Sequence, residues 1–161
     1  MSRQEFIPQV PYGTKDILPL DAARKRGVEN ELARLFLSWG YQEVVTPTFE
    51  YYETLRASAP ETADDSTFRF FDRSGRMLAL RPDMTTPIAR VAVMRMREQP
   101  LPLRLFYLAN VFRQEETQAG RQCEFYQAGV ELLGAGGVAA DAEVVALAVE
   151  ALLAAGLSDF Q

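Results

Sequence analysis

The stretch from Leu103 to Leu133, LRLFYLANVFRQEETQAGRQCEFYQAGVELL, decides the fold of this chain. Residues 103–112 and 124–133, at its two ends, are rich in the aromatic and branched apolar side chains that strands favour. The residues between them, 114–122, are polar and have the composition of a loop. We therefore predict two long strands, Leu103–Phe112 and Glu124–Leu133, joined by this loop.

Shorter strands are predicted upstream. Residues 68–71 and 77–80 are mostly apolar, and they flank Asp72-Arg73-Ser74-Gly75, a favourable turn sequence, so they should pair as a hairpin. Residues 43–46 form a short, largely β-branched run, and Pro47 follows where a central strand would be interrupted. We therefore expect a strand over residues 43–46 at a sheet edge or an interface.

Two helices are predicted before the long strands. The first begins at Asp21 as its N-cap and ends at Gly40, because apolar side chains recur between them at helical spacing. The second begins at a Thr85-Thr86-Pro87 cap and continues toward Pro100.

A third helix is predicted after the long strands. The small residues 134–140 have the composition of a turn, and the helix should extend from Asp141 to Ala155. We expect its apolar residues to lie in the core rather than against a partner. They are Val144, Val145, Leu147, Ala148, Ala151 and Leu152.

Hairpins mixed with helices, without regular strand-helix alternation, indicate an α+β fold in which helices back an antiparallel sheet. The chain has no internal repeat. The simplest interpretation is one domain over residues 1–161.

Composition excludes several kinds of function. The chain is 48% hydrophobic and 24% charged, as globular domains are, and no apolar run approaches the roughly 20 residues of a membrane span. It has no histidine, so zinc chemistry and Ser-His-Asp hydrolysis are not expected. Its formal charge of -5 argues against a broad nucleic-acid surface. We expect a cytoplasmic protein whose lone cysteine, Cys123, is a packing residue.

Polar residues gather on the two long strands. Period-two alternation places Gln127, Gly129 and Glu131 on one face, where an amide and a carboxylate could hold an ammonium group or an imidazole N–H. Arg113 and Arg121 could meet a phosphate or a carboxylate through their guanidinium forks. The alternative is a solvated strand face with weak cross-strand ion pairs.

Several motifs resemble those of class II aminoacyl-tRNA synthetases. The residues Trp39-Gly40-Tyr41-Gln42-Glu43-Val44-Val45-Thr46-Pro47-Thr48-Phe49 are similar to motif 1, which lies at the dimer interface of that class. The segment Phe112-Arg113-Gln114-Glu115, a loop with Arg121, and then Glu124-Phe125-Tyr126-Gln127 resemble motif 2, the hairpin that grips ATP. This resemblance implies a class II synthetase-like α+β domain that is incomplete at its C-terminal end.

The histidyl branch of this class is the closest resemblance. It comprises histidyl-tRNA synthetases and their paralogues, the regulatory subunits of ATP phosphoribosyltransferase. Gly13-Thr14-Lys15-Asp16-Ile17-Leu18-Pro19 is similar to the N-terminal segment of both, and Leu80-Arg81-Pro82-Asp83-Met84-Thr85 is similar to their amino-acid-binding loop. Because several separate motifs agree, the resemblance is more specific than any one of them alone.

The resemblance implies a histidine site. Asp83, Thr85 and Gln127 correspond to residues around the α-amino group of histidine, and Glu131 to one near the imidazole. These side chains supply the acceptors that an ammonium and an imidazole N–H require. The alternative for Asp83 and Thr85 is a turn and a helix cap, although one position can serve both roles.

Departures from the synthetase pattern favour the regulatory paralogue. Asp83-Met84 stands where synthetases have Glu-Gly, and Glu116-Thr117-Gln118 where they continue Arg-Pro-Gln. An acid near a triphosphate is unfavourable. The resemblance then implies that Arg113, Glu115 and Arg121 line a vestigial nucleotide-facing surface, and we expect no catalytic residue, cofactor or metal.

The resemblance therefore implies a non-catalytic regulatory subunit in histidine biosynthesis. It would activate a short-form ATP phosphoribosyltransferase catalytic subunit, take L-histidine as effector, and dimerise through the segment from Tyr41 to Phe49. Neither tRNA nor a membrane is an expected partner. Two alternatives stay open: the catalytic-domain part of a histidyl-tRNA synthetase, and a dimerisation module with a vestigial pocket.

Overall fold

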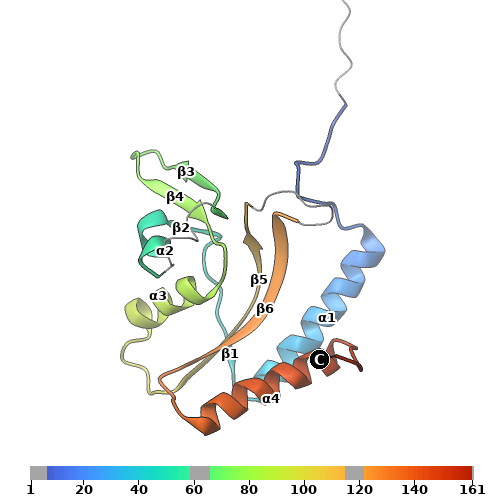
Figure 1. The fold of residues 1–161 in the computed structure, drawn as a ribbon, viewed down its shortest axis with the longest axis vertical. Coiled ribbons are helices and arrows are strands. Elements are labelled where there is room, and N and C mark those ends of the chain that lie inside the picture. The colour runs from blue at the N-terminus through green and yellow to red at the C-terminus, as the bar shows by residue number, and fades with distance from the viewer. Residues whose placement is uncertain (1–6, 59–65, 115–121, 161) are drawn as a thin grey trace, which may run out of the picture.

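The long hairpin forms the middle of the molecule. A computed structural model describes residues 7–58, 66–114 and 122–160. In it β5 (Leu103–Phe112) pairs antiparallel with β6 (Glu124–Leu133), from Leu103 opposite Leu133 to Phe112 opposite Glu124. Both strands have the predicted bounds. Figure 1 shows the two strands curving together between helices on either side.

The third strand of this sheet is shorter than predicted. It is β1 (Gln42–Glu43), which pairs with β5 in parallel. The predicted edge position is therefore confirmed, while the sheet is mixed rather than antiparallel. The predicted strand over residues 43–46 is wrong beyond Glu43. Its physical reason is that the carbonyl groups of Thr46 and Pro47 accept hydrogen bonds from the Arg81 side chain, outside the sheet.

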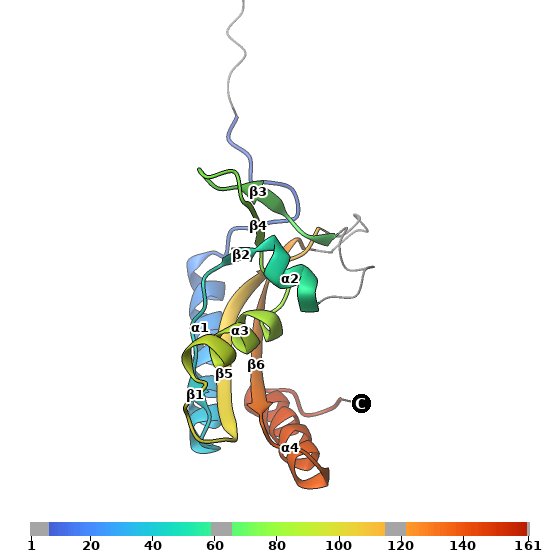
Figure 2. The ribbon, with the colours of Figure 1, turned by 90° about the vertical axis from the view of Figure 1, so that its left-hand side faces the viewer.

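A second, smaller sheet has the order β2-β4-β3 and lies at the end of the hairpin where β5 finishes (Figure 2). The predicted hairpin is confirmed as β3 (Arg69–Phe71) and β4 (Met77–Leu80), whose turn is fixed because Asp72 Oδ1 accepts from two backbone N–H groups. Two elements that precede this hairpin in the chain, β2 (Phe49–Tyr51) and α2 (Tyr52–Ser58), were not predicted.

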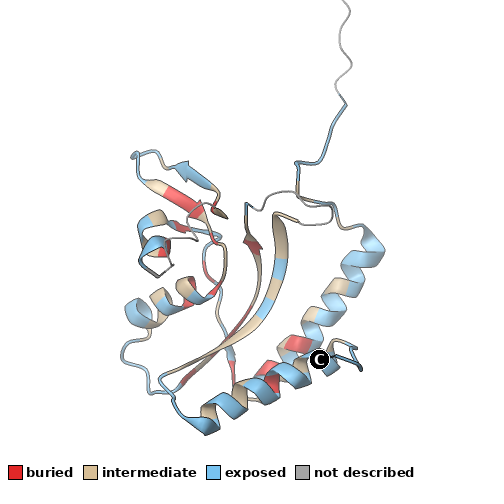
Figure 3. Ribbon diagram, viewed as in Figure 1, coloured by how far each residue is buried: buried red, intermediate tan, exposed pale blue. Residues whose placement is uncertain are grey.

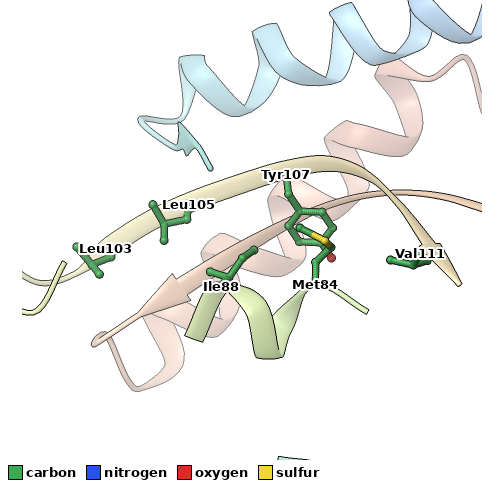
Figure 4. Packing of buried hydrophobic residues seen from close by; sticks show 6 residues of the cluster. All are labelled: Met84, Ile88, Leu103, Leu105, Tyr107 and Val111. Atoms are coloured by element: carbon green, nitrogen blue, oxygen red, sulfur yellow. The ribbon is translucent and has the colours of Figure 1, made fainter. Parts of the chain in front are cut away.

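Helices cover both faces of the β5–β6 hairpin (Figure 1). On one face, α3 (Thr85–Arg95) packs through Met84 and Ile88 against Tyr107 and neighbouring side chains of β5 (Figure 4). On the other face, α1 (Pro19–Ser38) and α4 (Val138–Ala154) pack around Phe106. Alternation along β5 sends Tyr107 to one core and Phe106 to the other.

Helix boundaries differ from the predictions. The N-cap of α1 is Leu18 rather than Asp21, because Pro19 occupies the first turn, where its missing N–H costs nothing. The N-cap of α3 is Met84, and the helix ends at Arg95 rather than near Pro100. Residues 138–140, predicted as part of a turn, begin α4 after Gly137, whose φ of 95° is open to glycine.

The prediction that the apolar residues of α4 lie in the core is wrong for three of the six, Val145, Ala148 and Leu152, which are exposed. Leu147 is fully buried, whereas Val145 is 63% exposed and Leu152 is 38% exposed (Figure 3). One narrow face of α4 therefore packs on the sheet. Within the described ranges, no helix is both long and apolar enough to cross a membrane.

Cys123 has the packing role that was predicted. Its backbone N–H donates to the Gly13 carbonyl at 2.7 Å, and a Cβ at Gly13 would lie 2.4 Å from the Cys123 sulfur. The glycine thus lets the N-terminal segment cross the start of β6 at close range. Cys123 is a free cysteine, and its thiol lies against Gly13.

Candidate functional site

Residues from the N-terminus of α3 and from β6 meet on the α3 face of the sheet. The Thr85 hydroxyl donates to Glu131 Oε1 at 2.8 Å, although the two residues are far apart in sequence. Thr85 is exposed and Glu131 is half-buried, so this contact is open to a ligand. Two of the four residues that are predicted to bind histidine are therefore in direct contact.

Packing of α3 holds the loop before it in place. Met84 and Ile88 are buried, so Asp83 and Thr85 on either side of Met84 remain at the surface of the core. Asp83 Oδ1 accepts a long hydrogen bond, 3.4 Å, from the Thr86 N–H. Asp83 thus has the helix-start role that was its alternative interpretation, and a contact of that length leaves its carboxylate able to accept from a ligand.

Tyr107 belongs to this site and was missed. It lies opposite Gly129, and a Cβ at Gly129 would stand 2.4 Å from the Tyr107 hydroxyl oxygen, so the phenol crosses β6 where the side chain is missing. Burial raises the pKa of Tyr107, and the negative charges of Glu131 and Asp83 raise it further. The phenol is therefore a protonated donor at neutral pH. The signal in the sequence was Gly129, between Gln127 and Glu131.

Gln127 contributes an unsatisfied acceptor. It lies two residues from Gly129 on the same face of β6, so it and Glu131 are about 13 Å apart along the strand. Its Oε1 atom is buried without a hydrogen-bond partner among the described residues. Such an atom costs about 1–3 kcal/mol when left unpaired, so a ligand donor that reached it would gain that much.

Arg113 is attached to the same loop. Its Nε donates to the Pro82 carbonyl at 2.9 Å, and its guanidinium lies 5.2 Å from the centre of the Phe125 ring. This bond does not use the two terminal amino groups, which could meet an anionic group of a ligand. Glu115 and Arg121, the other predicted phosphate-facing residues, lie outside the described residues.

Together these groups suit a zwitterion. Asp83, Glu131 and Gln127 accept hydrogen bonds, Tyr107 donates, and Arg113 supplies a cation at one side. This is the chemistry of an amino acid with an additional N–H group.

A separate hollow lies on the opposite face of β6. It has a volume of about 610 Å³ and is lined by the N-terminal segment, the start of α1 and the start of β6. Its charged side chains are of both signs, including Lys15, Asp21 and Glu124. Because such a lining favours no particular ligand, we place the candidate site at α3 and β6, where side-chain chemistry converges.

The chain is similar to known proteins over most of its length. A family model described as histidyl-tRNA synthetase matches residues 13–161. An ATP phosphoribosyltransferase regulatory subunit from Moorella thermoacetica is 57% identical over 153 residues, which are 95% of this chain and 39% of that protein. A histidine–tRNA ligase from Thermococcus kodakarensis is 47% identical over 92% of this chain and 34% of its own length.

A solved structure is similar over the same region. It is described as an ATP phosphoribosyltransferase regulatory subunit/histidyl-tRNA synthetase from Bacillus halodurans C, with a TM-score of 0.88 and 41% identity. The match covers 98% of this chain and 41% of that one, so the chain spans about two fifths of such relatives. It confirms the class II synthetase-like α+β fold. From the extent of the family match and this structural agreement, we conclude that the chain belongs to the histidyl-tRNA synthetase family.

Proposed function

We propose that this chain is the histidine-binding part of a regulatory subunit of ATP phosphoribosyltransferase. The observation that carries the proposal is the unpaired, buried Oε1 of Gln127, on the face of β6 that also presents Glu131. An ammonium group would satisfy this atom. The name of the Moorella thermoacetica relative supports the regulatory role.

In the proposed complex, Asp83, Thr85 and Gln127 accept hydrogen bonds from the α-amino group, and Glu131 accepts from an imidazole N–H. The bond between Thr85 and Glu131 need not break, because a hydroxyl that donates to the carboxylate can still accept from the ammonium. Arg113 would lie on the side of the ligand carboxylate. No residue in this arrangement needs to act as a nucleophile or a general base.

Binding would regulate a partner rather than transform a substrate. Histidine must bind one quaternary arrangement better than another, by about 1–3 kcal/mol in typical allosteric proteins. We infer that the subunit activates a short-form catalytic subunit in the cytoplasm, that histidine reverses the activation, and that two copies associate through residues 41–49. It would have no aminoacylation activity and no tRNA partner.

The test is phosphoribosyltransferase activity of the short-form catalytic subunit, with and without the full-length gene product, while histidine is titrated. We expect activation that histidine reverses. Glu131→Gln should preserve activation and raise the histidine concentration needed for inhibition by about tenfold or more, since a hydrogen bond to a charged group contributes about 1.5–3 kcal/mol. Isothermal titration calorimetry would measure the same loss directly.

Glu124→Gln is the matched control. Glu124 lies on the same strand but bonds the Asn110 amide, away from the site, so histidine inhibition should stay as in the wild type. Activation without any response to histidine would contradict the proposed effector role. No activation at all would contradict the regulatory role.

A histidyl-tRNA synthetase is the second candidate, and the Thermococcus kodakarensis ligase favours it at 47% identity. It predicts histidine-dependent exchange between ATP and pyrophosphate by the full-length protein alone. That result, without activation of the phosphoribosyltransferase, would establish the enzyme instead. Absence of histidine binding in every assay would favour the dimerisation module.

A further inference from the structure

Arg81 is a buried arginine one residue before the ligand loop, residues 82–85. Its side chain is 6% exposed. Nε donates to the Asn110 carbonyl at 2.8 Å, at the end of β5. Nη1 reaches the Thr46 carbonyl at 2.9 Å and the Pro47 carbonyl at 3.2 Å. One guanidinium therefore joins the chain after β1 to the end of β5.

The backbone of Arg81 repeats this connection. Its N–H donates to the Thr48 carbonyl at 3.1 Å, and its carbonyl accepts from the Phe112 N–H at 3.0 Å. The next carbonyl, that of Pro82, accepts from the Arg113 side chain. The first residues of the ligand loop are thus held from two sides.

Hydrogen-bond geometry, rather than charge, favours a guanidinium at this place. Burial lowers the pKa of Arg81, and the negative charge of Glu50 opposes that effect. Glu50 is itself held by three hydrogen bonds from Nε and Nη2 of Arg90 in α3. A planar fork can satisfy carbonyl groups on both sides at once, whereas a lysine ammonium is a point charge on a flexible stem.

We propose that Arg81 is a positioning residue, which sets the affinity of the site for the ligand's α-amino group by fixing the loop that carries Asp83 and Thr85. The inference rests on the proposed histidine site. Glu131 is held by β6 rather than by the loop, and it meets the loop through the Thr85 hydroxyl, so recognition of the imidazole depends on this clamp less than recognition of the amino group does. Loss of the clamp should weaken one end of the ligand selectively.

Two ligands distinguish recognition of the α-amino group from recognition of the imidazole. L-histidine has the α-amino group, and 3-(imidazol-4-yl)propionate lacks it. Calorimetry on the full-length gene product gives the ratio of the two affinities. We expect Arg81→Lys to lower the preference for histidine by about tenfold, which is the equivalent of one lost hydrogen bond to a charged group. The affinity for 3-(imidazol-4-yl)propionate should stay within about twofold of the wild type.

Arg104→Lys is the matched control. Arg104 is an arginine of β5 whose guanidinium makes two hydrogen bonds, to Glu143 of α4, and it lies on the opposite face of the sheet. Any loss of stability in this variant should leave the ratio of the two affinities unchanged. A general structural effect would change both variants alike.

A double-mutant cycle tests whether Arg81 acts through the loop. Asp83→Asn directly removes the negative charge that the amino group would meet, so adding Arg81→Lys to it should cause little further loss of preference. Full additivity of the two losses would overturn the inference. So would an unchanged ratio in Arg81→Lys, or an equal loss for both ligands.

Wild-type protein provides a further measurement if Arg81→Lys does not fold. Histidine should slow amide hydrogen exchange at Arg81 and Phe112, whose N–H groups bond within the clamp, as well as in the loop. Protection confined to residues 83–86 would overturn the inference. Failure of the wild type to bind histidine would instead overturn the proposed function, and this inference with it.

Discussion

At the scale of single residues, the site depends on a side chain that is missing. Gly129 lies opposite Tyr107, and its lack of a Cβ leaves room for the phenol between the acceptors Gln127 and Glu131. Burial and two nearby carboxylates raise the pKa of that phenol, which keeps it a donor. A site built on a close approach of this kind is sensitive to one methyl group.

Gly129→Ala should therefore displace Tyr107 and weaken histidine binding by about tenfold, with a cost of about 1–3 kcal/mol in the free energy of unfolding. Calorimetry and urea unfolding measure the two effects. Gly27→Ala is the control, because a Cβ there meets nothing within 4 Å and alanine is favoured in a helix. Wild-type histidine affinity in Gly129→Ala would show that Tyr107 has no part in the site.

At the scale of elements, a helix can be fixed against the sheet by a few strong contacts, as α4 is. Helix α4 is joined to β5 and to the segment between α1 and β1 through Glu143, which accepts two hydrogen bonds from Arg104 and one from Tyr41. Burial, followed by the hydrogen bond to Glu143, raises the pKa of Tyr41 to about 12. The apolar contribution of α4 is concentrated in Leu147, since most of its other large side chains remain exposed.

Leu147→Ala should lower the free energy of unfolding by about 2–5 kcal/mol, because it leaves a cavity beside Phe36 and Phe106. Val145→Ala, two residues away and 63% exposed, should change it by less than about 0.5 kcal/mol. Urea unfolding monitored by circular dichroism compares the two. Equal losses would mean that α4 packs through a different face.

At the scale of the whole molecule, an apolar surface follows β1. Val45 is 84% exposed and Phe49 is 49% exposed, in the segment that we predict to join two copies. The Arg81 clamp lies directly behind this segment, at Thr46 and Pro47. The Arg81 side chain would therefore hold both an interface at this segment and the ligand loop in place.

Val45→Glu should therefore shift the full-length protein from dimer to monomer, because it places a charge in an apolar contact. Sedimentation velocity would detect the shift. Val93→Glu, on a residue of α3 that is 70% exposed outside this segment, should leave the sedimentation coefficient as in the wild type. An unchanged dimer in Val45→Glu would place any self-association elsewhere.

Local pattern was sufficient for the elements whose stability is local. The bounds of β5 and β6 and the β3–β4 turn were predicted because strand composition and an Asp-Gly turn act over a few residues. The end of α1 was predicted for the same reason, since Gly40 adopts a φ of 81° that suits glycine. Asp83, Thr85, Gln127 and Glu131 were found through resemblance and acceptor chemistry, and their role in binding histidine stays a prediction.

The sequence by itself determined the α+β class, the long hairpin and the alternation that puts Gln127, Gly129 and Glu131 on one face. Only the tertiary structure decided that β1 stops after Glu43, that most of α4 is exposed, and that Tyr107 crosses Gly129 into the site. The physical reason is the range of the interactions. Arg81, which lies far along the chain from β1, binds the carbonyl groups of Thr46 and Pro47, so they cannot extend the strand. No local sequence pattern records such a competitor.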